Sequence, residues 1–177
     1  LKSGKGIKLN ISVQDKKLCS RYMAVAISGI KVQSSPEWMQ TRLRASGVRP
    51  INAIVDVTNY VMLEIGQPMH AFDYDAIKNL SGAVEIVVRS AKSHEEFTTL
   101  DGHKHTLRDK MLMISTRQKS LAIAGVMGGD LSAVSDTTHT IILESAIFDA
   151  RSIRRTANTL GMRTESSSRF ERGRFDF

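Results

Sequence analysis

The chain has 177 residues, of which 41% are hydrophobic and 24% are charged, a composition typical of a globular domain with a sizeable core. No apolar run approaches the roughly 20 residues that a membrane-spanning helix needs, and the basic N-terminal segment lacks the apolar centre of a signal peptide. The single cysteine, Cys19, excludes an internal disulfide. These features predict one domain over residues 1–177, or two intertwined halves, located in the cytoplasm and without membrane contact.

The net charge of +7 is concentrated at the two ends of the chain. Residues 1–44 carry nine Lys and Arg against two acids, and residues 151–177 carry seven Arg against three acids. The segment between them is mildly acidic, with nine basic residues against thirteen acids. This distribution suits a polyanionic partner whose reactive end is not itself a phosphate. A solvated basic surface without any partner is the alternative.

The first part of the chain predicts two strands followed by a helix. Apolar residues alternate over residues 7–13, and a longer strand within residues 18–32 places Tyr22, Ala24, Ala26 and Ser28 on one face. The sequence Ser-Ser-Pro-Glu at 34–37 predicts a helix start with a hydroxyl cap, and Gly47 is expected to end that helix.

Residues 49–65 predict an amphipathic helix that could line a pocket. Its apolar stripe consists of Ile51, Ile54, Val55, Val61, Met62 and Ile65. Thr58 interrupts this stripe, Asn59 lies beside it, and His70 follows in an expected loop at residues 69–71, after Gly66 and Pro68 end the helix. Burial of an unpaired polar group costs about 1–3 kcal/mol, so the pattern is compatible with one wall of a small-molecule pocket. From spacing alone, the better interpretation is a core helix with a satisfied threonine and a histidine in a turn.

The second half predicts mostly strands. Strands are expected at residues 84–88, 111–115, 121–124 and 140–143, and Asp101-Gly102 predicts a hairpin turn. The glycine-rich segment 125–129 indicates close approach of backbone to another group. Asp149 is expected to cap a last helix that ends at Gly161. The sum is an α+β fold with about three helices.

Familiar catalytic motifs are missing from the sequence. It has no G-x-S-x-G, no Walker loop and no G-x-G-x-x-G opening a helix. His103 and His105 could share a strand face and bind a metal, but no further ligands cluster with them, so a simple hairpin is the better interpretation. Glu144 is expected at the end of a buried strand, where it either pairs with an arginine or accepts a hydrogen bond from a ligand hydroxyl.

Several stretches together resemble a known family. They are RPINAIVDVTNYVMLEIGQPMHAFD at 49–73, LAIAGVMGG at 121–129, IILESAIF at 141–148 and GMRTESSSRFERG at 161–173. In this order they resemble the B3/B4 module of the β chain of bacterial phenylalanyl-tRNA synthetase, over nearly the whole chain. The resemblance implies a three-layer domain, a β-sandwich of unusual topology with helices packed on it, belonging to a longer β chain. It also implies editing: hydrolysis of misacylated tyrosyl-tRNA(Phe) by water attack on the aminoacyl ester.

The resemblance also implies roles for individual residues. Glu144 would contact the phenolic hydroxyl of tyrosine, with Ala124, Gly125 and Ser166 completing the substrate pocket. The positions expected around the reacting ester are Arg49, Thr58, Asn59, His70 and Thr164. Implied partners are the acceptor end of tRNA(Phe), tyrosine, and a synthetase α chain in a heterotetramer of two α and two β chains. No cofactor or metal is expected in this domain, since ATP and magnesium would serve other modules of the parent enzyme.

The chain departs from the family pattern at two places. Ser166 stands where many relatives have alanine, and the terminal GRFDF leaves the pattern after Gly173. Two other functions remain open from sequence: a non-catalytic tRNA-binding or scaffold module of the same synthetase, and an unrelated small-molecule-binding β domain. Only the last of these predicts no dependence on tRNA.

Overall fold

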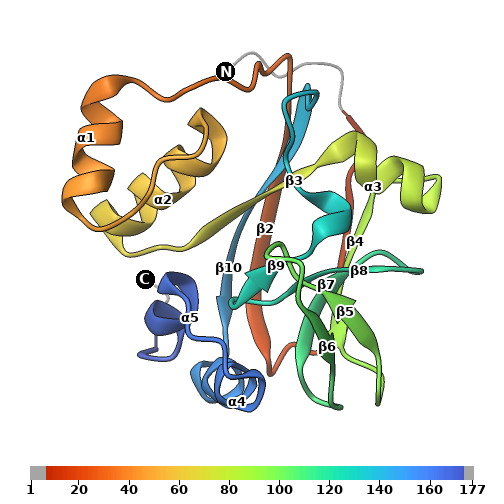
Figure 1. The fold of residues 1–177 in the computed structure, drawn as a ribbon. Helices are drawn as coiled ribbons and strands as arrows, with labels where there is room; N and C mark the ends of the chain where they lie inside the picture. The colour runs from red at the N-terminus through yellow and green to blue at the C-terminus, as the bar shows by residue number, and fades with distance from the viewer. Residues whose placement is uncertain (1–6, 174–177) are drawn as a thin grey trace.

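The computed structural model describes residues 7–173, so the departure at residues 174–177 lies outside the described part. Two larger β-sheets form the centre of the fold (Figure 1). The first contains β1 (Asn10–Val13), β4 (Glu85–Ser90), β7 (Leu112–Ser115), β8 (Ser120–Ile123) and β9 (Met127–Gly128), in that order. β1 pairs in parallel with β4, and the remaining neighbours are antiparallel.

The second sheet places one long strand between two others. β10 (Thr140–Phe148) pairs antiparallel with β2 (Cys19–Ser28) on one side and with β3 (Met69–Asp73) on the other. A small hairpin of β5 (Glu96–Thr98) and β6 (Lys104–Thr106) confirms the turn predicted at Asp101-Gly102. The two larger sheets share one hydrophobic core, to which Ile86, Ile114, Phe72 and Ile142 all contribute.

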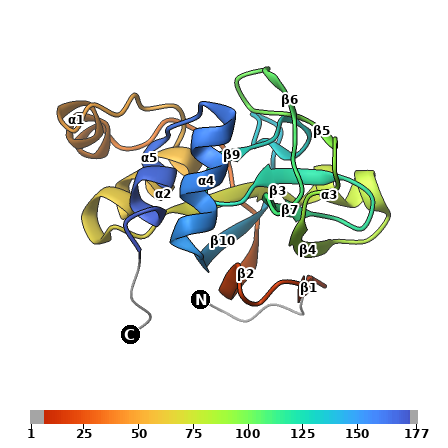
Figure 2. The same cartoon turned by 90° about the horizontal axis from the view of Figure 1, so that it is seen from below.

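Helices cover the flanks of these sheets. α1 (Glu37–Ala45) and α2 (Ala53–Ile65) lie together beside β3, and α3 (Tyr74–Ser81) follows that strand at the opposite side of the view (Figure 1). α4 (Ala150–Leu160) and α5 (Glu165–Phe170) lie next to each other, as Figure 2 also shows, and the 3-10 turn η1 is Asp130–Ser132. The predicted α+β class is confirmed. None of these helices between residues 7 and 173 could cross a bilayer.

Local sequence signals set the helix ends that matter for the site. The Asn52 side chain accepts hydrogen bonds from the amides of Ile54 and Val55 at the start of α2, and Gly66 ends that helix with φ of 74°. Asp149 caps α4 in the predicted way and Gly161 ends it in the left-handed conformation. Glycine adopts this conformation without the steric cost of a Cβ atom.

Other predictions about the helical layer are wrong. α1 has no side-chain cap, because its N-cap residue is Pro36, and the hydroxyl of Ser35 donates to Asp56 Oδ2 at 2.5 Å. The predicted apolar stripe of α2 is too long: Ile51 and Ile65 are 68% and 65% exposed, and both lie at or beyond the helix ends. Tertiary packing therefore uses only the middle of the stripe, around Met62.

The strands around the site also differ from expectation. Residues 69–71 form part of β3 rather than a loop, because their backbone pairs with β10. β10 extends to Phe148, so Glu144 lies in the middle of a strand and not at its end. Helices α3 and α5 were not predicted, and Met127 and Gly128 form a short strand within the glycine-rich segment.

Candidate functional site

A cavity of about 460 Å³ lies between α2, the second sheet, the glycine-rich segment and α5. Its size falls within the range of about 300–1,000 Å³ that is common for small-ligand pockets. Most of its lining is apolar, with side chains such as Val55, Met62, Phe72 and Ile123. The polar groups that line it are therefore few, and they come from several different elements.

Glu144 is a buried carboxylate that lines this cavity. Its side chain is 7% exposed, and its Oε2 accepts a hydrogen bond from the Tyr22 hydroxyl at 2.6 Å. Burial raises the pKa of Glu144 to about 7, and the hydrogen bond from Tyr22 opposes that rise. No ion pair within residues 7–173 engages this carboxylate, so the alternative of a neutralising arginine is not what the described part shows.

His70 lines the cavity next to Glu144. The two residues are directly opposite each other on β3 and β10, so their side chains emerge on the same face of the sheet. The His70 ring packs edge-on against Phe72, with ring centroids 4.5 Å apart, and it lies against the backbone of Gly128. Burial lowers the pKa of His70 to about 4, so the imidazole is neutral at physiological pH.

α2 contributes Thr58 and Asn59 to the cavity wall. The Thr58 hydroxyl donates to the carbonyl of Val55 within the helix at 2.8 Å, which matches the alternative of a satisfied threonine. Its oxygen can still accept a hydrogen bond from a ligand. No hydrogen bond in the described part of the chain engages the Asn59 amide, so this group is available to a ligand.

The opposite wall is formed by the glycine-rich segment and by α5, which docks on it. The hydroxyl of Thr164 caps α5 and donates to the carbonyl of Val126 at 2.9 Å. The hydroxyl of Ser166 donates to the carbonyl of Gly125 at 3.1 Å. Ala124 and Gly125 line the cavity together with these two side chains. The hydroxyl that Ser166 adds relative to alanine therefore attaches α5 to the wall.

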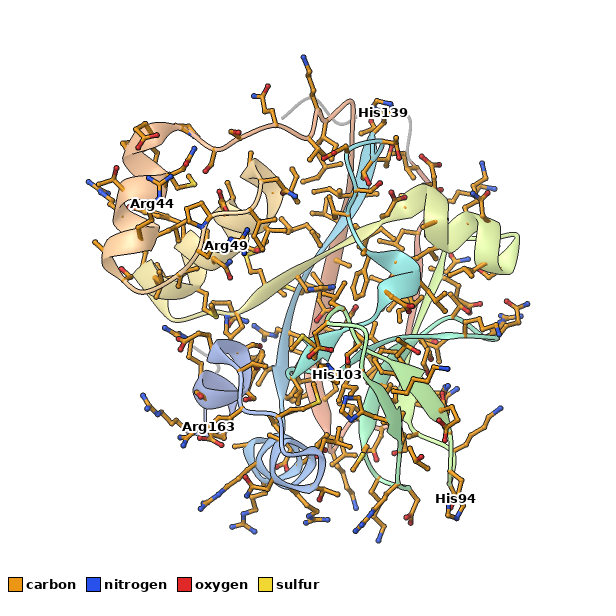
Figure 3. The ribbon with its side chains drawn as sticks, viewed as in Figure 1. Arg44, Arg49, His94, His103, His139 and Arg163 are labelled. Carbon is orange, nitrogen blue, oxygen red and sulfur yellow. The ribbon has the colours of Figure 1, made fainter. Side chains whose placement is uncertain are left out.

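Arg49 is the one predicted site residue that the structure does not bring into this cavity. It lines a separate pocket of about 250 Å³ with Ser35, Arg44 and Asp56. Figure 3 shows Arg44 and Arg49 on the α1–α2 side of the molecule. Ile51 lines both pockets, so the two adjoin each other at the start of α2.

Sequence reasoning missed the part that Tyr22 plays. Tyr22 was placed on the correct face of β2, but nothing in its spacing indicated a contact with Glu144, which is 122 residues away along the chain. The available signal was a phenol among small residues, Ala24 and Ala26, on a face that turns inward. A buried hydroxyl in such a position needs a hydrogen-bond partner.

Among residues 7–173, no further metal-binding side chains gather around the two histidines of the predicted hairpin. His103 precedes β6 and its Nδ1 lies 3.2 Å from Asp101 Oδ1, whereas His105 lies within the strand. Within residues 7–173, no group of three or more His, Cys, Asp or Glu side chains could hold a metal ion.

Comparison with known proteins shows which family the sequence of this chain resembles. The sequence profile of the B3/4 domain matches residues 18–176. This chain is 51% identical over 173 residues to the phenylalanine–tRNA ligase β subunit of Dehalococcoides mccartyi strain 195. It is 49% identical over 164 residues to that of Carboxydothermus hydrogenoformans. These alignments cover 97% and 93% of this chain but 21% and 20% of the relatives, so the chain spans about a fifth of their length.

A solved structure supports the same assignment at the level of the fold. An N-terminal fragment of the phenylalanyl-tRNA synthetase β subunit from Pyrococcus horikoshii aligns with a TM-score of 0.59. The alignment covers 92% of this chain and 50% of that chain at 13% identity, so it shows a similar fold alone. With the profile matching most of its length, the chain belongs to the B3/4 domain family.

Proposed function

We propose that the chain is an editing domain that hydrolyses tyrosyl-tRNA(Phe), the misacylated product of a phenylalanine–tRNA ligase of which it forms part of the β subunit. The observation that carries this proposal is Glu144, a buried carboxylate beside an apolar cavity, with a phenol and no described cation as its partner. The names of the relatives supply the context of phenylalanine ligation. In the parent enzyme the β subunit would assemble with an α chain, and the acceptor end of the tRNA would reach this cavity.

The chemistry of the substrate explains why such a pocket is useful. Tyrosine is phenylalanine with one added hydroxyl, and an apolar synthetic pocket rejects an added hydroxyl only by roughly a hundredfold. A second pocket that hydrogen-bonds the hydroxyl can discriminate by roughly 10⁴ to 10⁵, because the wrong ligand leaves a buried polar group unpaired. Glu144 supplies such an acceptor, so tyrosine is held and phenylalanine is released.

The hydrolysis itself needs only modest help from the protein. An aminoacyl ester is already activated, so a positioned water and stabilisation of the developing oxyanion suffice. With its pKa lowered to about 4, His70 is a weak base, and its proposed role is to orient the water or the ester by hydrogen bonding. Thr58, Asn59 and Thr164 would hold the ester end of the ligand, and Ala124, Gly125 and Ser166 its side chain.

Arg49 would act from outside the cavity. Its guanidinium lines the adjoining polar pocket with Arg44, a setting suited to the phosphate or ribose of the terminal adenosine. This assignment places the nucleotide at the α1–α2 side and the amino acid in the apolar cavity, with Ile51 between the two.

The decisive experiment compares two substrates on the assembled synthetase that contains this chain. We expect deacylation of tyrosyl-tRNA(Phe) to be much faster than deacylation of phenylalanyl-tRNA(Phe). Equal rates would rule out hydroxyl recognition as the basis of the activity.

Glu144→Ala tests the assigned acceptor. Since a hydrogen bond to a charged group contributes about 1.5–3 kcal/mol, the preference for tyrosyl-tRNA should fall by about 10- to 100-fold. The matched control is Glu96→Ala, which removes an exposed carboxylate that also accepts a hydroxyl hydrogen bond, from Thr106. Unchanged selectivity in Glu144→Ala would reassign Glu144 to a structural role.

A second candidate is a non-catalytic tRNA-binding or scaffold module. It is favoured by the fact that the hydroxyls of Thr58, Thr164 and Ser166 all have structural hydrogen bonds. The same deacylation assay separates the two candidates, because a scaffold module would leave tyrosyl-tRNA intact.

A further inference from the structure

The contact between Tyr22 and Glu144 joins two strands through one face of the second sheet. In the register of β2 and β10, Glu144 is opposite Ala24 and Tyr22 is opposite Ala146, so the two side chains are diagonal neighbours. Such neighbours lie within reach of an aromatic side chain. The small side chains of Ala24 and Ala146 leave room for the phenol, which donates to Glu144 Oε2 at 2.6 Å.

The two oxygens of Glu144 have different surroundings. Tyr22 engages Oε2, whereas no hydrogen bond among residues 7–173 engages Oε1. Glu144 lines the cavity, but Tyr22 does not. Tyr22 therefore acts on a ligand only through Glu144, and one carboxylate oxygen is left for that ligand.

Few other ionisable groups face Glu144. Cys19 lies near it on β2, His70 is opposite it on β3, and Glu165 of α5 lines the same cavity. Burial, followed by the charge of Glu144, raises the pKa of Cys19 to about 12, and burial keeps His70 neutral. None of these three groups donates a hydrogen bond to the carboxylate within the described part of the chain, whereas Tyr22 does.

Tyr22 itself stays protonated over the whole working range of pH. Burial and then the negative charge of Glu144 raise the pKa of Tyr22 well above its usual value. Its hydroxyl is therefore a permanent donor, and donation to a carboxylate favours the ionised form.

We infer that Tyr22 is a positioning residue for hydroxyl recognition: its phenol holds one oxygen of Glu144, fixes the orientation of the carboxylate and favours its ionised form, so that a single oxygen receives the hydroxyl of the ligand. This inference rests on the proposed function for its catalytic consequence. Its physical content, the control of Glu144 by Tyr22, is independent of any reaction.

Tyr22→Phe tests both parts, because it removes the hydroxyl and keeps the ring that packs in the core. The matched control is Tyr74→Phe, which removes a hydroxyl that donates to the carbonyl of Lys8, away from the cavity. The first measurement is a carboxyl-carbon NMR titration of the chain labelled at glutamate, with the Glu144 signal assigned from Glu144→Gln. We expect Tyr22→Phe to move the Glu144 titration to higher pH and Tyr74→Phe to leave it unchanged.

The second measurement is deacylation of tyrosyl- and phenylalanyl-tRNA(Phe) by the assembled synthetase across pH 6 to 8. In Tyr22→Phe we expect the preference for tyrosyl-tRNA to fall by about three- to tenfold, the effect of an ordinary hydrogen bond, and the loss to be largest at the acidic end. Tyr74→Phe should keep the preference of the unchanged enzyme.

The outcomes separate this inference from the proposed function. An unchanged Glu144 titration in Tyr22→Phe overturns the inference, and so does a shifted titration with full selectivity retained. If the unchanged enzyme does not distinguish the two substrates, the proposed function fails. In that case the specificity role of Tyr22 fails with it, and a shifted titration would still establish its hold on the carboxylate.

Discussion

Glu144 and His70 face each other on neighbouring strands, and burial shifts their pKa values in opposite directions. Glu144 binds a proton more tightly in the folded than in the unfolded chain, so its contribution to stability falls as pH rises from about 4.5 to about 7. His70 binds a proton less tightly when folded, so its contribution rises as pH rises from about 4 to about 6.5. The two effects oppose each other over nearly the same range.

This opposition gives a prediction for stability. Each shift corresponds to about 3 kcal/mol, so the pair together should leave the free energy of unfolding almost independent of pH between about 4.5 and 6.5. In Glu144→Gln the free energy of unfolding should rise with pH, because only the effect of His70 remains. In His70→Gln it should fall with pH, because only the effect of Glu144 remains. Urea unfolding of the unchanged chain and of the two variants, at a series of pH values, measures these free energies. If the free energy of unfolding depends on pH in the same way in all three proteins, the prediction is wrong.

A half-buried carboxylate, Glu95, titrates outside this pH range and serves as an internal reference. Burial of Glu95 opposes its ionisation, but hydrogen bonds from Arg89 and Ser120 outweigh burial and lower its pKa to about 2. The stability that Glu95 contributes is therefore lost only as pH falls from about 4.5 toward 2. This loss of stability at acidic pH should be the same in all three proteins.

At the residue scale, sequence reasoning identified the chemistry better than the geometry. Glu144 stood out because a carboxylate among Ile141, Ile142 and Ala146 must be paired or reserved for a ligand. Its partner could not be predicted, because Tyr22 meets it through strand pairing between distant parts of the chain. The position of Arg49 in a separate pocket was also missed, because that pocket forms where α1 and α2 pack together, which the spacing of residues does not specify.

The glycine-rich segment shows how one element shapes the cavity wall. Gly125 has φ of 67°, and a Cβ atom there would lie 3.0 Å from Ile153 and Phe170 and 3.1 Å from Phe148. The backbone is thus pressed against the core on one side while α5 attaches to it through Ser166. Only glycine fits both the backbone angle and the space.

Gly125→Ala should therefore be more destabilising than an ordinary glycine substitution in this backbone conformation. The control is Gly161→Ala, where φ is 65° but a Cβ atom would meet nothing within 4 Å. Both variants carry the strain of a left-handed residue, of about 1–2 kcal/mol, and Gly125→Ala adds the cost of overpacking, of about 1–3 kcal/mol. Equal losses of stability in the two variants, measured by thermal or urea unfolding, would show that the side chains around Gly125 rearrange without cost.

At the element scale, the predictable features are those encoded by neighbouring residues. The ends of α2 and α4 and the β5–β6 hairpin follow from caps, glycines and an Asp-Gly turn. β3 was mistaken for a loop because its five residues, MHAFD, carry no alternating pattern, and pairing with β10 makes the strand. α5 was missed because it has only six residues, too few for a helical pattern to stand out, and it docks on the cavity wall through Thr164.

Residues of this chain line the cavity, although the chain spans only about a fifth of the length of its relatives. The sheet order, with β1 parallel to β4 and β10 central in the second sheet, depends on contacts that no local pattern specifies. Class was therefore predictable from sequence, whereas topology was available only through family resemblance. The same division would apply to the proposed function, in which this cavity acts on the ester and other modules of the synthetase hold the body of the tRNA.

If ester hydrolysis and binding of the tRNA body are carried out by different modules, the behaviour of the chain alone can be predicted. It should still deacylate tyrosyl-tRNA(Phe), but with a much higher KM than the assembled synthetase and a smaller change in kcat, because linked contacts raise effective concentration without altering the site. Steady-state kinetics of the chain and of the assembled enzyme, at the same ionic strength, measure this split. A loss confined to kcat would indicate that other modules complete the cavity.

The pairing of β3 with β10 has a consequence for how this protein can change over time. Glu144 and His70 are held opposite each other by the regular spacing of a sheet, which sets their Cβ atoms about 4.5–5.5 Å apart. Substitutions in the surrounding loops can widen or narrow the chamber, but they leave that interval untouched. Inserting or deleting a single residue within either strand would turn one of the two side chains to the far side of the sheet. Evolution can therefore change which ligands the cavity accepts by altering its loops. The paired strands β3 and β10 tolerate substitutions, but they do not tolerate a change in the number of their residues.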